Sequence, residues 1–233
     1  MIPISDNILN WKKPIISYWL IGLNIGLFLW ELRLEFTGEL YRFVHTWGIV
    51  PEQTNLAITN ALFYNPAAFI IVFGRLLALP VSLFLHSSFS QIISNIIFLW
   101  VFGKTIENIL GQKQYLILYL AAGIFAGMVQ IFLDPNLKVP IVGANCAIAS
   151  ILGAYIIRFP QARIDSIIPL IIVYIPVELP AFFYLFWWFV QQAFHSIGAL
   201  NIPGGINQFG LNFWGQMAGL ATGAAFMRII QRR

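Results

Sequence analysis

The chain has 233 residues, of which 59% are hydrophobic and only 9% are charged, and its mean hydropathy is +0.80. A soluble domain usually carries about 25% charged residues, so this chain cannot keep a polar surface in water and belongs in a bilayer. The net charge of +4 comes from cations concentrated in the loops on one side of the predicted spans. We therefore read this charge as a sign of topology, and expect no nucleic-acid partner.

Apolar runs of about 20 residues predict membrane-spanning helices, and the sequence contains six candidates. They cover residues 15–32, 81–102, 115–133, 143–159, 179–197 and 211–230. The sequence thus predicts an all-α membrane protein, a six-helix bundle in one domain over residues 1–233. The polar segment 1–14 precedes an apolar run that is too long for the core of a secretory signal and has no small-residue cleavage site, so the N-terminus is not interpreted as such a signal.

The segment 33–80 is too long for a simple connection between two spans. Its apolar stretches 56–63 and 67–79 are too short to cross a bilayer, so we expect short helices in the outer interface. Nine of the 13 Lys and Arg residues fall on the side of the N-terminus. Because cations favour the cytoplasmic side, both termini are expected there, in a bacterial inner membrane or a related internal membrane.

Three prolines, Pro169, Pro176 and Pro180, precede or begin the fifth predicted span. Proline kinks or ends a helix, so this part is expected to be bent or broken, either as an irregular lead-in or as a mobile gate. The aromatic run 182–189 that follows is apolar on all sides, so part of it must face lipid or another protein. The candidate partner-binding residues are Phe182, Phe183, Phe186 and Trp187.

Small residues make the fourth and sixth predicted spans slender, which lets two helix backbones approach closely. We expect these spans to pack against each other. The glycines expected at this contact are Gly143, Gly153, Gly215, Gly219 and Gly223. Asn145 and Gln216 stand near the outer starts of the same two spans, so they should lie at similar depth.

Few residues offer reactive chemistry. Cys146 is the only cysteine, which excludes an internal disulfide and a cysteine metal cluster. A reactive thiol needs a nearby base or cation, and no histidine stands near Cys146 in sequence, so a small buried side chain is favoured. Gln91 and Asn95 share a helix face, where they could donate to a bound carbonyl or bind neighbouring helices. No cofactor and no metal are expected.

Short motifs occur along the chain in a fixed order: residues 47–51 (WGIVP), 84–86 (FLH) with Asn95, 102–111 (FGKTIENILG), 143–148 (GANCAI), 152–155 (LGAY) and 218–223 (AGLATG). In this order, they resemble the rhomboid family of intramembrane serine proteases. The resemblance extends from the first span to the C-terminus.

Active rhomboids use a serine on the fourth span and a histidine on the sixth, while a histidine and an asparagine on the second span hold the oxyanion. By position, the resemblance places Asn145 at the serine, Cys146 at the glycine after it and Gln216 at the base. Gln91 stands at the second-span histidine, and only Asn95 is kept. A carboxamide neither gives up a proton to a neutral base nor shuttles one as imidazole does. The resemblance therefore implies a degenerate site, in which Asn145 and Gln216 are expected to hydrogen-bond.

Two hypotheses follow. The favoured one is an inactive rhomboid, a pseudoprotease that binds transmembrane helices of partner membrane proteins in a scaffold, assembly or quality-control role, with lipid around it. The alternative is an active protease whose nucleophile is Cys146, or whose dyad is misaligned, since Ser150 also lies on the fourth span. A channel or transporter has little support, because Glu178 is the one candidate for a charge on an ion pathway.

Overall fold

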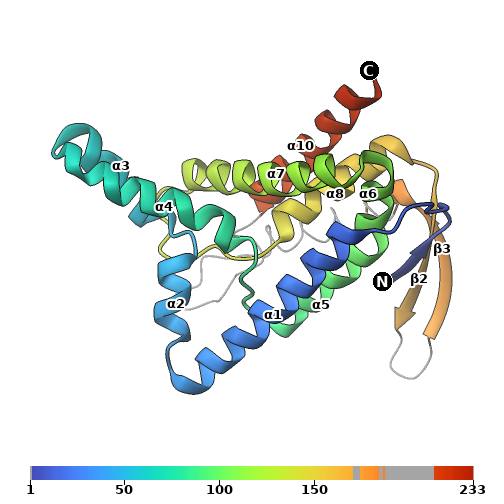
Figure 1. The fold of residues 1–233 in the computed structure, drawn as a ribbon, viewed down its shortest axis with the longest axis horizontal. Helices are drawn as coiled ribbons and strands as arrows, with labels where there is room; N and C mark the ends of the chain where they lie inside the picture. Colours follow the sequence, from blue (N-terminus) through green and yellow to red (C-terminus); the bar gives the residue numbers. More distant parts are fainter. Residues whose placement is uncertain (1, 170–173, 184–185, 187–212, 233) are drawn as a thin grey trace.

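Helices dominate the protein (Figure 1), and the predicted helical membrane class is confirmed. The structure is a computed structural model that describes residues 2–169, 174–183, 186 and 213–232. Its helices are α1 (Ile15–Thr37), α2 (Leu40–Trp47), α3 (Pro51–Phe63), the 3-10 turn η1 (Pro66–Ala68), α4 (Phe69–Ser82), α5 (Phe89–Phe98), the π-helical turn η2 (Leu99–Gly103), α6 (Lys104–Leu110), α7 (Gln112–Leu133), α8 (Asn145–Arg158) and α10 (Phe213–Gln231).

Three helical stretches in the described part are long and apolar enough to cross a membrane: Ile15–Thr37, Phe89–Leu110 and Gln112–Leu133. The fourth predicted span corresponds to α8, which has only 14 residues. The predicted fifth span lies mostly outside the described residues. The count of six spans therefore stays a prediction.

The second span differs from its predicted bounds of 81–102. Helix α4 ends at Ser82, and a new helix begins at Phe89 and continues through η2 and α6. The hydroxyl of Ser88 accepts a hydrogen bond from the backbone N–H of Gln91 at 3.2 Å, so Ser88 caps the start of α5. This cap starts the helix eight residues later than hydropathy alone suggested.

The outer segment 33–80 contains the short helices that were predicted there. Helices α3 and α4 lie side by side and extend away from the rest of the protein (Figure 1). A small core of Ala57, Ala61 and Val72 holds them together. Their position in a membrane interface stays a prediction.

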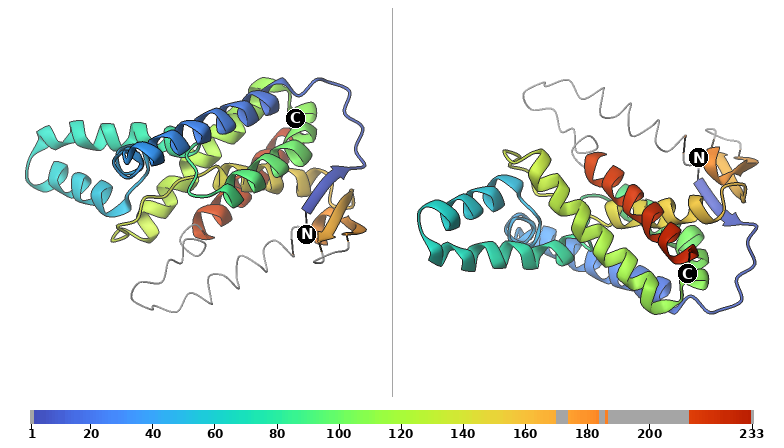
Figure 2. Two further views of the ribbon diagram at one scale, coloured as in Figure 1. Left: turned by 90° about the horizontal axis from the view of Figure 1, so that it is seen from below. Right: turned by 90° about the horizontal axis from the view of Figure 1, so that it is seen from above.

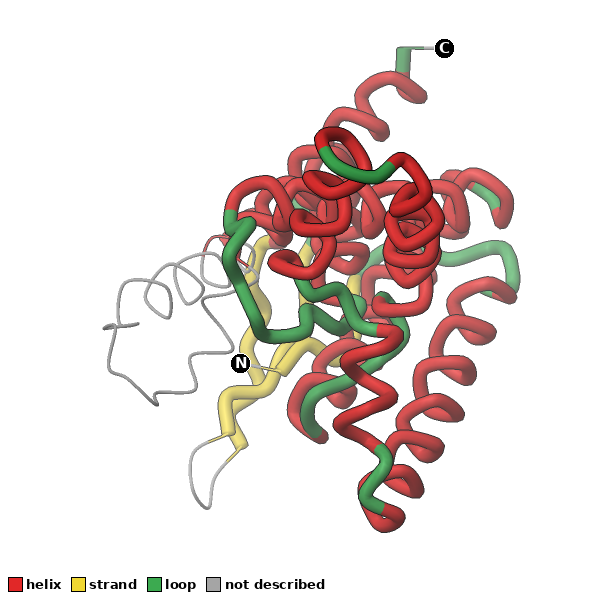
Figure 3. Tube along the Cα trace, turned by 90° about the vertical axis from the view of Figure 1, so that its left-hand side faces the viewer, coloured by secondary structure: helices red, strands yellow, loops and turns green. Residues whose placement is uncertain are grey.

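A three-stranded antiparallel sheet, which was not predicted, lies to one side of the helices (Figure 3). Strand β2 (Arg163–Pro169) pairs with β1 (Ile2–Asp6) on one side and with β3 (Tyr174–Pro180) on the other. The predicted polar N-terminal segment thus begins as a strand, and an all-α description must be amended to include the sheet. Both termini lie at the end of the bundle away from α3 and α4 (Figure 2).

The bent or broken lead-in expected around the three prolines is a pair of strands, because Pro169 belongs to β2, and Pro176 and Pro180 belong to β3. This strand lies at the edge of the sheet, where proline is tolerated because one row of N–H groups has no strand to bond. Exposed and buried side chains alternate over residues 163–166, as in a strand, but the buried Ser166 is polar, so hydropathy alone gave only a weak signal.

The core gathers around α8, which packs against both α7 and α10. Its central residues, from Cys146 to Tyr155, are all buried. Tyr115 and Tyr119 of α7 and Met227 of α10 are fully buried in the same cluster. A helix that is buried on all sides needs no polar face, which explains why α8 is apolar almost throughout.

Candidate functional site

The helices α8 and α10 approach until backbone meets backbone. A Cβ atom placed on Gly219 would collide with the carbonyl oxygen of Cys146, and one on Gly223 with that of Ser150. From the other side, a Cβ on Gly153 would collide with the carbonyl oxygen of Leu220. Glycine at these positions therefore sets the distance between the two helices that carry the degenerate dyad positions.

Gln91 lies against the segment that leads into α8. Its Nε2 donates to the carbonyl of Val142 at 3.2 Å, and its Oε1 accepts from the N–H and the hydroxyl of Ser87 at 2.8 and 2.9 Å. Gly143 has φ +114°, a backbone conformation that is strained for any residue with a side chain. A Cβ at this position would also collide with Gln91. The amide of Gln91 is thus part of the scaffold of this loop.

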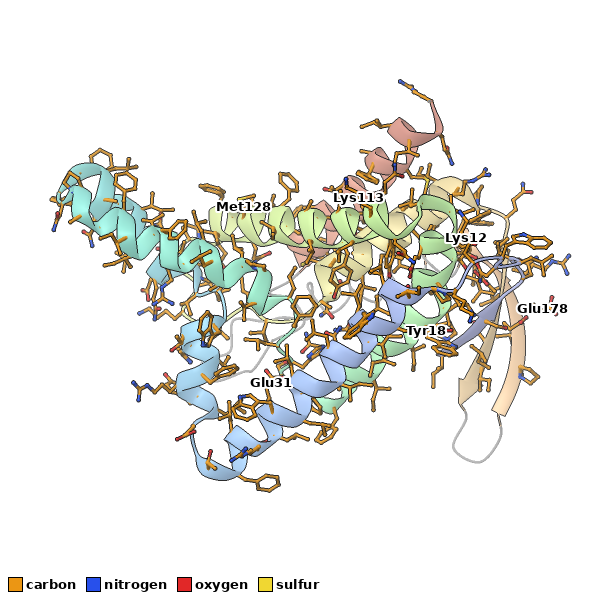
Figure 4. All side chains as sticks on the ribbon, in the orientation of Figure 1. Lys12, Tyr18, Glu31, Lys113, Met128 and Glu178 are labelled. Atoms are coloured by element: carbon orange, nitrogen blue, oxygen red, sulfur yellow. The ribbon has the colours of Figure 1, made fainter. Side chains whose placement is uncertain are left out.

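His86 and Asn95 form a second buried pair beside Gln91. Asn95 Nδ2 lies 3.3 Å from Nε2 of His86, which accepts when that nitrogen is unprotonated. Glu31 of α1 (Figure 4) accepts the backbone N–H of His86 with both carboxylate oxygens, at 3.0 and 3.1 Å. Sequence reasoning missed Glu31, although a carboxylate inside a predicted span is a recognisable signal of a buried polar contact.

The predicted hydrogen bond between Asn145 and Gln216 is absent. Asn145 is the first residue of α8 and is half-buried, while Gln216 on α10 is buried, and its Oε1 has no hydrogen-bond partner in the described part of the chain. Gly215 packs against α8, since a Cβ there would lie 2.9 Å from Sγ of Cys146. Successive helix residues point about 100° apart, so Gln216 is turned away from that contact.

The two alternative nucleophiles are both buried. Cys146 is 7% exposed, and its sulfur packs toward Gly215 on α10. The hydroxyl of Ser150 is fully buried and donates to the carbonyl of Ala147 at 2.6 Å, within its own helix. An acyl-transfer nucleophile needs a base within hydrogen-bonding reach, and neither side chain has one among the contacts that the described residues make.

Gln130 of α7 is a site residue that sequence reasoning did not find. It is buried, and its Oε1 accepts the backbone N–H of Gly215 at 3.2 Å. This N–H belongs to the first turn of α10, where donors lack an intrahelical acceptor. An amide in an otherwise apolar run is the signal that could have revealed it.

The expected partner-binding residues lie in a different region, directly after strand β3. Phe182 and Phe186 are 55% and 61% exposed, and Phe183 is also exposed. Trp187 lies outside the described residues. Phe182, Phe183 and Phe186 follow β3, whereas the degenerate dyad positions Asn145 and Gln216 lie on α8 and α10.

Sequence comparisons place this arrangement in a family. The rhomboid-domain family model matches residues 74–233, well over half of the chain. The chain is 33% identical over 115 residues to the mouse presenilin-associated rhomboid-like protein, mitochondrial, an alignment that covers 48% of this chain and 28% of that protein. It is 25% identical over 152 residues to yeast Rhomboid protein 1, mitochondrial, covering 63% and 37%. It is 29% identical over 142 residues to the Bacillus subtilis Rhomboid protease GluP, covering 61% and 24%.

The chain belongs to the rhomboid family. It aligns with between 24% and 37% of the length of these curated relatives. Two of the three carry a mitochondrial designation, so the expected bacterial inner membrane gains no support from them. As a member of this family it is a membrane protein, and its apolar helices are surrounded by lipid.

Proposed function

We propose that this protein is a rhomboid without protease activity that binds transmembrane helices of partner membrane proteins. The observation that carries this proposal is the presence of carboxamides, Asn145 and Gln216, at the two positions where active rhomboids need serine and histidine. Loss of one dyad member in a serine protease costs roughly a million-fold in turnover. Loss of both leaves at most weak binding of a transition state.

The hydrogen bonds around these positions support the same reading. The amide nitrogens of Gln91 and Asn95, at the oxyanion positions, are bonded to Val142 and His86 within the protein. An oxyanion hole needs donors aimed at the reacting oxygen. Here the amide of Gln91 bonds the loop before α8, and the amide of Asn95 bonds the ring of His86. A binding protein that keeps the rhomboid bundle has no need of free donors there.

We further propose that both termini face the cytoplasmic side. Lys12 and Lys113 lie near the inner ends of α1 and α7, and Arg228 near the end of α10, which supports a cation-rich inner side. The grouping of both termini at one end of the bundle agrees with an even number of spans.

The proposed docking surface consists of Phe182, Phe183, Phe186 and Trp187. Large apolar side chains that are exposed on a membrane helix meet either lipid or another protein, and aromatic residues are frequent at the centre of protein interfaces. A partner helix that packs here would be recognised by its apolar surface, without a catalytic step.

Photocrosslinking in native membranes tests this docking surface. A benzophenone amino acid replaces Phe183, and in a matched control it replaces Leu29, an exposed residue of α1. We expect the probe at position 183 to form one discrete adduct, mapped to a transmembrane segment of the captured protein, and the probe at position 29 to capture lipid. Capture of lipid alone at both positions would discard the proposed docking surface.

A further inference from the structure

The N-terminal segment is bonded to parts of the chain about 150 residues away. Strand β1 pairs with β2, from Ile2 opposite Ile167 to Asp6 opposite Ile164. Beyond the strand, the backbone N–H of Asn7 donates to the carbonyl of Arg163 at 3.1 Å, and the N–H of Arg163 donates to Asn7 Oδ1 at 3.0 Å. Residues 2–7 thus follow the edge of β2 from Arg163 to Ile167.

Asp6 anchors this segment to the helical bundle. Its Oδ2 accepts from the hydroxyl of Thr105 on α6 at 2.7 Å and from that of Tyr155 on α8 at 2.9 Å. Asn10 adds a bond of 3.3 Å from its Nδ2 to Thr105. One carboxylate therefore joins the N-terminal strand to two helices of the core.

The hairpin β2–β3 connects α8 to the chain that follows Pro180. At the base of the hairpin, the N–H of Ala181 donates to the carbonyl of Ala162 at 2.7 Å. Ser5 holds the hairpin from the side, since its hydroxyl donates to Asp165 at 2.6 Å. Anything that fixes the hairpin also fixes the start of the segment that begins at Ala181.

The pairing of β1 with β2 is shorter and less regular than the pairing of β3 with β2. The β2–β3 pairing is regular over both strands, from Arg163 opposite Pro180 to Pro169 opposite Tyr174. The β1–β2 pairing is shorter and is interrupted by a bulge between Pro3 and Ser5. In addition, Oδ1 of Asp6 is buried without a partner among the described residues. A short, bulged terminal strand is the part of such a sheet that opens first.

We propose that residues 2–10 form a strap that holds the β2–β3 hairpin against α6 and α8, and that release of this strap frees the hairpin and the chain after Pro180. The strap requires no partner. Because Phe182 and Phe183 directly follow the hairpin, the strap would also control the proposed docking residues from the inner end of the bundle. This consequence rests on the proposed function.

Thiol labelling tests the strap directly. Ser166 is 1% exposed and shares its face of the sheet with Ile164 of the core cluster, so a Ser166→Cys thiol reports whether the hairpin stays packed against the helices. The native Cys146 is buried in the bundle and reports in the same molecule whether the core has opened. A large maleimide reagent added to the detergent-solubilised protein distinguishes zero, one and two labelled thiols by mass.

In the Ser166→Cys background, Asp6→Ala is expected to raise the labelling rate of the introduced thiol at least about tenfold, because the anchoring bonds to a charged acceptor are lost. Tyr155→Phe removes one of the two hydroxyls that donate to Asp6, so it should raise the labelling rate by less than Asp6→Ala does. Glu52→Ala, which breaks an ion pair with Lys138 in the outer segment, is the control and should leave the rate unchanged. Cys146 should stay unlabelled in every variant.

Three results would overturn the strap. The first is rapid labelling of the introduced thiol when Asp6 is intact. The second is a rate in both Asp6→Ala and Tyr155→Phe that matches the Glu52→Ala control. The third is joint labelling of both thiols on loss of Asp6, since Asp6 would then hold the whole bundle together. None of these results depends on whether a partner docks, so the strap and the docking surface can fail separately.

Discussion

Replacement of Gly223 by alanine is expected to destabilise the protein by roughly 1–3 kcal/mol or more, although it adds a single methyl group. The added carbon would collide with the carbonyl oxygen of Ser150 on α8. A backbone atom cannot move aside as a flexible side chain can, so α10 must shift away from α8. Gly219→Ala should act in the same direction, because its methyl would meet the carbonyl oxygen of Cys146.

The matched control is Gly26→Ala on α1, where an added Cβ meets nothing within 4 Å. In an open helix position, alanine is preferred to glycine by roughly 0.5–1 kcal/mol, so this variant should unfold at the same temperature or slightly higher. The measurement is the midpoint of thermal unfolding of Gly223→Ala, Gly219→Ala and Gly26→Ala in one detergent. Equal midpoints for Gly223→Ala and Gly26→Ala would show that α8 and α10 are not in backbone contact.

Glu107→Leu is expected to cost several kcal/mol, because it leaves buried donors without an acceptor. Glu107 of α6 is 2% exposed, and its carboxylate accepts from the backbone N–H groups of Ile16 and Ser17 and from the Ser17 hydroxyl, at 2.7 to 2.9 Å. These groups form the first turn of α1, where N–H donors have no intrahelical partner. Each buried donor left unsatisfied costs about 1–3 kcal/mol.

Glu107→Gln keeps an oxygen of similar position, so it should cost clearly less than Glu107→Leu. Glu52→Gln serves as a surface control, since its ion pair with Lys138 is largely exposed and such pairs contribute about 0–1 kcal/mol. The readout is the denaturant or thermal midpoint of each variant. If Glu107→Leu and Glu52→Gln were equally stable, the carboxylate would not be the cap of α1.

Hydropathy predicted the long helices well, because a span of about 20 apolar residues is a local property of the sequence. The runs at 15–32 and 115–133 fall within α1 and α7. The sheet was missed because β1 and β2 pair across about 160 residues, and each strand alone is too short to give a strong signal. Pro176 and Pro180, which suggested a bent or broken lead-in to the fifth span, belong to an edge strand, and only the strand pairing reveals this.

The residues of the site could be named from sequence, but their contacts could not. The family resemblance assigned Gln91 to the position of the second-span histidine, and the structure bonds Gln91 to Val142, three residues before Asn145. The orientation of Gln216 depends on how α10 is rotated about its axis, and the glycines packed against α8 set that rotation. For the same reason the role of Gln130, which accepts a bond from Gly215, was invisible until the helices were assembled.

The most direct measurement is a test for an acyl-transfer nucleophile in the purified protein. The wild type is incubated in bilayers with a fluorophosphonate probe and, separately, with a transmembrane substrate of an active rhomboid. A rebuilt variant carries Gln91→His, Asn145→Ser, Cys146→Gly and Gln216→His. The active rhomboid itself serves as the positive control.

We predict that the wild type neither binds the probe covalently nor cuts the substrate, because Asn145 and Gln216 cannot exchange the proton that acyl transfer requires. Any labelling or cutting by the rebuilt variant would show that these four positions are the site. Substrate cleavage by the wild type that disappears in Cys146→Ala or Ser150→Ala would contradict the account, since the protein would then be a protease with a different nucleophile.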